Sequence, residues 1–183
     1  MRHVLLINGS PNPNGATGHI LTCISDTLDA NAFDVQTICL GECRINYCKG
    51  CKACYSSAQC LQDDDVSYIM ECMDKADIIV IASPSYWGDI TGQLKVFFDR
   101  CTPYCNGLHP PKLPGNKMGY AIALRTGSNS SECRHIIESI HHFYGHMNIP
   151  IGETSGLYFC GIENPADIAS YNEDIIRFSH SLR

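Results

Sequence analysis

The chain has 183 residues and is 44% hydrophobic, which is enough for one compact domain with a real core. Its formal net charge is −6 and its acidic residues are dispersed, so neither nucleic acids nor anionic membranes are expected partners. No stretch is apolar over the roughly eighteen residues that a membrane helix needs, and no cleavable leader is recognisable. We therefore expect a soluble, cytoplasmic domain over residues 1–183 whose partners are small molecules and proteins.

Short β-branched runs alternate with longer helical patterns along the chain. Strands are predicted at residues 3–7, 35–40, 78–82, 118–124 and 156–160. Helices with one apolar stripe are predicted at residues 17–28, 65–75, 92–101, 131–147 and 166–182. Right-handed crossovers with one reversal of strand order then give a three-layer α/β/α sandwich around a five-stranded parallel sheet. Such a sheet binds ligands at the carboxyl ends of its strands.

The loop after the first predicted strand, NGSPNPNGATGHI, is small and polar and leads directly into a helix. Backbone N–H groups at that helix start, with the hydroxyls of Ser10 and Thr17, would form an anion site suited to a phosphate. Residues 4–37 contain no Lys or Arg, so hydrogen bonds and the helix dipole would hold that phosphate. The loop matches neither a Walker loop nor a G-x-G-x-x-G fingerprint, which disfavours ATP and a Rossmann-bound dinucleotide. An ordinary capped turn is the alternative.

Four cysteines follow in the stretch YCKGCKACYSSAQC, which we expect to be neither helix nor strand. Cys48, Cys51, Cys54 and Cys60 have the spacing C-x2-C-x2-C-x5-C, close to the compact runs that bind [4Fe–4S] clusters. Structural zinc is less favoured, because its ligands usually come as two separated pairs. The same spacing is also compatible with reduced thiols or with a redox disulfide, which the nearby Cys101 and Cys105 could form as well. After this stretch, Asp64 or Asp65 is expected to cap the next helix.

The loop after the third predicted strand, SPSYWGD, carries two adjacent aromatic residues between a proline and a glycine. Tyr86 and Trp87 would form a wall for a flat ring system whose edge bonds to backbone N–H groups. Two core residues that cap the sheet are the alternative. After the fourth strand, RTGSNSSE would close over the same ligand.

Two further features lie toward the C-terminus. The stretch TPYCNGLHPPKLPGNK at residues 102–117 is predicted to be a surface loop able to cover a site. His141, His142 and His146 suggest a metal site, but no carboxylate or cysteine signature accompanies them. A solvated or interfacial helix face is the favoured interpretation.

Three of these segments, in this order, resemble the hallmarks of flavodoxin-like NAD(P)H-dependent FMN reductases, including the iron–sulfur flavoprotein group. They are GSPNPNGATGHI, CKGCKACYSSAQCLQDDD and ADIIVIASPSYWGDITGQLKVFFDR. The resemblance implies a flavodoxin-like fold with strand order 2-1-3-4-5 and non-covalent FMN at the strand carboxyl ends. It assigns the phosphate to Ser10, Asn12, Gly15, Ala16 and Thr17, and the ring to Pro84, Ser85, Tyr86, Trp87, Gly88, Asp89, Thr126 and Gly127. It also implies a homodimer or tetramer with the cysteine stretch near the neighbouring subunit.

The function inferred from these features is that of an FMN-dependent oxidoreductase. It would take a hydride from NAD(P)H and pass electrons to a small-molecule or protein acceptor, with no side chain needed as acid or base. One alternative is an iron–sulfur flavoprotein electron carrier with a [4Fe–4S] cluster at the four cysteines. A second is a non-catalytic flavin or thiol redox sensor.

Overall fold

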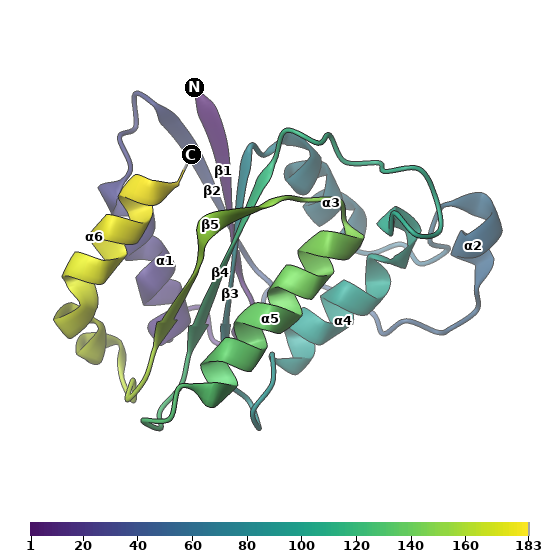
Figure 1. Ribbon diagram of the computed structural model, residues 1–183. Coiled ribbons are helices and arrows are strands. Elements are labelled where there is room, and N and C mark those ends of the chain that lie inside the picture. The colour runs from purple at the N-terminus through teal and green to yellow at the C-terminus, as the bar shows by residue number, and fades with distance from the viewer. Residues whose placement is uncertain (183) are drawn as a thin grey trace.

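The computed structural model describes residues 1–182 and contains one sheet of five parallel strands (Figure 1). The strands are β1 (Arg2–Asn8), β2 (Phe33–Cys39), β3 (Ile78–Pro84), β4 (Met118–Leu124) and β5 (Ile151–Phe159), in the order β2-β1-β3-β4-β5. The order reverses between β1 and β3, so the connections that leave these strands diverge and open a crevice at their carboxyl ends. The predicted flavodoxin-like sandwich is confirmed.

All five predicted strands are present, and three of them begin earlier than predicted, β1 by one residue. β2 begins at Phe33, ahead of the predicted residue 35. β5 begins at Ile151, ahead of the predicted residue 156, and its pairing with β4 shifts register between Gly119 and Ala121. Most residues of β5 before the shift are not apolar, so the sequence there lacks the pattern of a buried strand and did not predict the start of β5.

The helices lie close to the predicted ranges. They are α1 (Ala16–Thr27), α3 (Val66–Lys75), α4 (Gly92–Arg100), α5 (Ser131–His146) and α6 (Asn172–Ser181). The predicted helix at 166–182 begins instead as a 3-10 helix, η2 (Pro165–Tyr171), because Pro165 follows Asn164, whose capping box with Asp167 fixes a separate start. The expectation that the four-cysteine stretch contains no helix is wrong, since it includes the short helix α2 (Ala53–Ser57).

Two helical layers cover the sheet (Figure 1). α1 and α6 pack on one face, where alternate strand residues such as Val4, Leu6 and Val80 are buried. α3, α4 and α5 pack on the other face against Leu5 and Ile7. Because both faces are covered, the inner strands are continuous apolar runs. No helix within residues 1–182 has the length and apolar character to cross a membrane.

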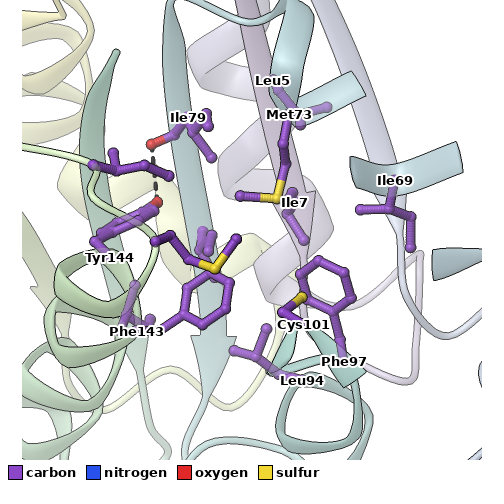
Figure 2. Close-up of a cluster of buried hydrophobic side chains, with 14 of the residues drawn as sticks. Leu5, Ile7, Ile69, Met73, Ile79, Leu94, Phe97, Cys101, Phe143 and Tyr144 are labelled. Atoms are coloured by element: carbon purple, nitrogen blue, oxygen red, sulfur yellow. Dashed lines mark hydrogen bonds between the residues drawn. The ribbon is translucent and has the colours of Figure 1, made fainter. Parts of the chain in front are cut away.

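The core between the sheet and helices α3, α4 and α5 contains a buried hydroxyl group with two hydrogen-bond partners (Figure 2). The Tyr144 hydroxyl lies 3.0 Å from the carbonyl oxygen of Ile79 and 2.9 Å from that of Tyr120. A Cβ at Gly119 would stand 2.8 Å from the Tyr144 ring, so only glycine leaves room for it. Burial raises the pKa of Tyr144 well above its usual value, so this hydroxyl stays neutral and structural.

Candidate functional site

The loop between β1 and α1 is organised by short-range hydrogen bonds from side chains. The Ser10 backbone N–H donates to Asn8 Oδ1 at 2.9 Å, and the Asn12 N–H donates to Ser10 Oγ at 3.1 Å. The Gly15 N–H donates to the Asn12 carbonyl at 3.2 Å. These bonds bring Ser10, Asn12 and Gly15 together, as predicted, and fold the loop over the start of α1.

The start of α1 is open to an anion. In the described part of the chain, no side chain caps this helix. The first-turn N–H groups, among them those of Ala16 and Thr17, therefore point out of the helix without an intrahelical partner. Thr17 is buried while Asn12 is exposed. A helix start of this kind suits a phosphate, and it carries no lysine or arginine.

A buried hydroxyl network joins this loop to the one after β3. Thr91 is the N-cap of α4, where its Oγ accepts from the Leu94 N–H at 3.2 Å. The same hydroxyl donates to the Gly9 carbonyl, and the Thr91 N–H donates to Ser83 Oγ at 3.2 Å. Ser83 and Thr91 are fully buried. Sequence reasoning missed both, although a Thr directly before the pattern GQLKVFF is an N-cap signal.

Residues 86–89 form a two-residue turn closed by hydrogen bonds between Tyr86 and Asp89 at 3.0 and 3.2 Å. Trp87 (φ 54°) and Gly88 (φ 82°) both lie in the left-handed region, the conformation of a type I′ turn. A tryptophan in that region is strained, which is typical of functional positions. Tyr86 and Trp87 are both exposed, so the alternative that they are core residues is wrong.

An ionic network ties this turn to the loop after β4. Ser85 Oγ donates to Glu132 Oε2 at 2.6 Å, and Glu132 Oε1 lies 3.1 Å from Arg125 Nη1. Arg125 also donates to the carbonyl of Asn129 at 2.9 Å, and its guanidinium covers Gly127. Thr126 is exposed beside them. Sequence reasoning missed Arg125 and Glu132, because neither pairs with a near neighbour in a recognisable motif.

The four predicted cysteine ligands lie together around one cavity. Cys48, Cys51, Cys54 and Cys60 line a cavity of about 220 Å³ with Lys49, Lys52 and Arg100. Burial raises the pKa of the Cys54 thiol, and the charges of Cys60, Cys48 and Cys51 add to the rise. All cysteines of the described chain are free thiols, so no disulfide joins Cys101 to Cys105.

A buried ion pair anchors the base of this cysteine segment, residues 40–65. Arg100 forms a bidentate pair with Asp64 at 2.5 and 3.1 Å, and both side chains are 1% exposed. Arg100 also donates to the Asn46 carbonyl at 2.8 Å and to Cys60 Sγ at 3.5 Å. Burial alone would raise the pKa of Asp64, but the hydrogen bond from Arg100 holds it below its usual value.

Of the two aspartates expected to cap α3, only Asp64 accepts a hydrogen bond from a helical N–H group. Asp65 occupies the N-cap position without a side-chain cap bond, and its carboxylate accepts from the Arg44 N–H at 2.6 Å. Asp64 accepts from the first helical N–H, that of Val66, at 3.3 Å. Its principal partner is Arg100, which sequence reasoning could not foresee because the two residues are 36 positions apart.

The stretch at residues 102–117, predicted to be a surface loop, begins with the 3-10 helix η1 (Thr102–Tyr104) and packs onto the cysteine segment. His109 Nε2 lies 2.8 Å from the Cys54 carbonyl oxygen, and Lys112 donates to the Ala58 carbonyl. The backbones of Lys52 and Ala58, at either end of α2, are in the left-handed region. Contacts far along the chain therefore hold α2 in place.

The histidines do not converge on a metal site. His142 Nε2 and His146 Nε2 are 3.0 Å apart, and Cys105 Sγ lies 3.6 Å from His146 Nδ1. Among residues 1–182, no three His, Cys, Asp or Glu side chains are grouped closely enough to ligate a single ion, and this holds for the four cysteines as well as for the histidines. His141 is placed 3.4 Å from the Ser155 carbonyl oxygen.

Within one chain, the cysteine cavity is not beside the predicted flavin loops. α2 lies near the C-terminal end of α4, and the turn at residues 86–89 lies at the N-terminal end of the same helix (Figure 1). α4 runs from Gly92 to Arg100, which is about 13 Å along its axis at 1.5 Å per residue. Within one chain, α4 thus lies between the cysteine cavity and the predicted flavin loops (Figure 1).

Both sets fit the groups that they were predicted to hold. The uncapped start of α1 offers N–H donors to a phosphate. Four thiols line one cavity next to cationic side chains, which suits an anionic cluster with four thiolates. The Nε atom of Arg100 is a buried donor without a hydrogen-bond partner in the described residues, so an acceptor from outside the chain would satisfy it.

Comparison with known proteins agrees with this geometry. A family model described as NADPH-dependent FMN reductase matches residues 2–157. An iron-sulfur flavoprotein of Methanosarcina thermophila is 32% identical over 163 residues, which cover 88% of this chain and 82% of that protein. An iron-sulfur flavoprotein of Archaeoglobus fulgidus is 33% identical over 126 residues, 69% of this chain and 56% of that protein. This chain therefore matches only about half the length of that relative.

Solved structures share the fold at low sequence identity. The NAD(P)H:quinone oxidoreductase from Methanothermobacter marburgensis has a TM-score of 0.71 and 17% identity, with 97% of this chain and 93% of that one covered. At this identity the likeness establishes the fold alone.

Proposed function

The chain belongs to the NADPH-dependent FMN reductase family, and from this premise we propose that it moves electrons from NAD(P)H through FMN to an acceptor by way of a cluster at its four cysteines. Membership makes it an oxidoreductase with FMN as cofactor. The observation that carries the remainder of the proposal is the cavity lined by Cys48, Cys51, Cys54 and Cys60. The names of the relatives from Methanosarcina and Archaeoglobus support it.

Bound FMN supplies the hydride chemistry, and the chain supplies position and electrostatics. The N–H groups of Ala16 and Thr17 and the hydroxyl of Ser10 would bind the phosphate. The turn at residues 86–89 would line the ring, since in the described chain no hydrogen bond uses the N–H groups of Trp87 and Gly88. Those donors would stabilise negative charge at the ring edge. Pro84, Ser85 and Asp89 would complete this wall, with Thr126 and Gly127 opposite.

A cluster held by the four cysteines would carry single electrons between the flavin and the acceptor. Lys49 and Lys52 line the same cavity and would offset the negative charge of four thiolates. Since α4 separates the cysteines from the flavin loops of the same chain, the segment would serve the flavin of a second copy. A homodimer or tetramer is therefore part of the proposal.

The test is an anaerobic purification followed by flavin, iron and sulfide analysis and an optical spectrum of one sample. We expect FMN and about four irons per chain, and bleaching of the flavin band on addition of NADH or NADPH. Cys54→Ser should lose the iron, whereas Cys23→Ser, on α1 outside the cysteine segment, should retain it. Flavin without iron in the wild-type protein would overturn the cluster, and a flavin that neither nicotinamide reduces would overturn the electron donor.

A second candidate is an electron carrier that does not use a nicotinamide directly. The separation of the cysteine cavity from the flavin loops favours it, because a protein donor could reach that cavity without touching the flavin. Reduction by a reduced ferredoxin, with no reaction with NADH or NADPH, would select this candidate.

A further inference from the structure

Arg100 reaches the cysteine cavity from the protein interior with a permanent charge. It is 2% exposed, lines the cavity and places Nη2 3.5 Å from Cys60 Sγ. We propose that Arg100 is a positioning residue that sets the reduction potential of the centre held by the cysteines, through its hydrogen bond to Cys60. This inference rests on the proposed cluster site.

The physical reason is a difference in charge between the two redox states. One-electron reduction adds one negative charge to the centre, so a nearby cation and an N–H donor stabilise the reduced state more than the oxidised state. An arginine guanidinium cannot lose its proton at neutral pH, so its effect does not depend on titration. Lys49 and Lys52 also line the cavity, but both are exposed, and water and salt screen them.

The guanidinium has donor capacity that the described chain does not use. Nη1 and Nη2 bind Asp64, the Asn46 carbonyl and Cys60, but Nε is buried and unpartnered. Buried N–H groups are rarely left unpaired in folded proteins. A sulfur atom of a bound cluster could accept a hydrogen bond from Arg100 Nε.

Asp64 makes the inference testable, because it acts on the potential in the opposite direction. Its carboxylate clamps the guanidinium through two hydrogen bonds and partly cancels its charge. Removal of the arginine charge should lower the potential, whereas removal of the aspartate charge should raise it. A purely structural role for the pair predicts no such opposition, because either variant would simply loosen the same segment.

The experiment is an anaerobic redox titration with dithionite as reductant, followed by electron paramagnetic resonance of the cluster. The variants are Arg100→Met, Arg100→Lys, Asp64→Asn and the double variant Arg100→Met with Asp64→Asn. Arg177→Met is the control, because Arg177 lies on α6, on the other face of the sheet, in an exposed pair with Asp174. For Arg100→Met we expect the reduced cluster to be about tenfold less stable relative to the oxidised one, about 59 mV for one electron.

The expected order of potentials, from lowest to highest, is Arg100→Met, the double variant, wild type and Asp64→Asn, with Arg177→Met equal to wild type. If Arg100→Met does not fold, the double variant still tests the order, because it leaves no unpaired buried charge. In that case Arg100→Lys should lie between the double variant and wild type. Equal iron content with unchanged potentials in the arginine and aspartate variants would overturn this inference. Absence of iron from the wild-type protein would overturn the proposed cluster instead.

Discussion

The β1–α1 loop and the cysteine segment each join a strand to a helix, but they are fixed in different ways. The first is short and uncharged, and most of its hydrogen bonds join residues two or three positions apart, such as those of Ser10 and Asn12, with long-range bonds at Gly9. The second is long and held by side chains from distant parts of the chain, with Arg100 at its base and His109 and Lys112 above α2. The conformation of a loop of the first kind depends mainly on its own residues, whereas that of the second kind depends on residues elsewhere in the chain.

The two regions also handle charge differently. The predicted phosphate site offers backbone N–H groups and a helix dipole, which do not depend on any one side chain. The cysteine cavity places thiols among Lys49, Lys52 and Arg100. Single substitutions should therefore damage the cysteine segment most when they change charge, and the β1–α1 loop most when they change backbone packing.

The largest expected effect comes from Asp64→Ala, which leaves the Arg100 charge buried and uncompensated. Loss of one partner of a buried ion pair costs about 3–5 kcal/mol of unfolding free energy. Urea denaturation of the metal-free protein measures it. Asp63→Ala, at the exposed neighbouring position, should change stability by less than about 0.5 kcal/mol. Equal stability of the two variants would show that the ion pair does not anchor the segment.

The next effect tests the β1–α1 loop through its packing. A Cβ at Gly18 would stand 2.0 Å from the Pro13 carbonyl oxygen, whereas a Cβ at Gly92 meets no heavy atom within 4 Å. Gly18→Ala should cost about 1–3 kcal/mol, because the loop must move away from α1. FMN titration should show weaker binding in the same variant. Gly92→Ala should fold and bind FMN as the wild type does, and a loss in both variants would point to helix effects unrelated to the loop.

A smaller effect is expected for Thr91→Val, which breaks the hydroxyl link between the two flavin loops. The variant loses the N-cap of α4 and the donor to the Gly9 carbonyl, at a cost of about 1–2 kcal/mol. Thermal unfolding and FMN affinity should fall together. Thr91→Ser keeps both hydrogen bonds and should restore both quantities; if it does not, the methyl group rather than the hydroxyl matters.

Acid should weaken the cysteine segment before it affects the β1–α1 loop. The folded-state pKa of Asp64 is below its usual value of 3.8, so its contribution to stability is fully present above that value. The contribution is lost as the pH falls through the lower folded-state pKa. The difference in urea midpoint between wild type and Asp64→Asn should therefore shrink as the pH is lowered below 3.8. A constant difference would mean that the charge of Asp64 does not stabilise the fold.

The smallest effect is expected for Glu132→Gln, which removes the charge that pairs with Arg125 but keeps an acceptor for Ser85. Both side chains are partly exposed, at 19% for Arg125 and 34% for Glu132, so the pair contributes at most about 1 kcal/mol. A loss of FMN affinity of about fivefold or less corresponds to that energy. Glu138→Gln, exposed on the same helix, should bind FMN as the wild type does. A larger loss would give Glu132 a role beyond positioning.

The sequence by itself determined the sheet, its order and the family. Apolar runs such as residues 78–82 can be buried on both faces only in a parallel sheet covered by helices, so local pattern was enough to predict the layers. Ser10 and Thr17 were named from the small polar loop that leads into a helix, and the family resemblance added Asn12 and Gly15; the local hydrogen bonds of this loop then bring Ser10, Asn12 and Gly15 together. The spacing of the four cysteines likewise placed them around one cavity.

Only the tertiary structure decided what surrounds those residues. The sequence predicted only a helix cap for Asp64, whereas the structure pairs it with Arg100. Thr91 and Glu132 are part of the candidate site because they contact Gly9 and Ser85. Local sequence cannot specify such contacts, since an ion pair or hydrogen bond between distant residues depends on how whole elements pack. For the same physical reason, only the fold revealed that α4 lies between the cysteine cavity and the predicted flavin loops of its own chain.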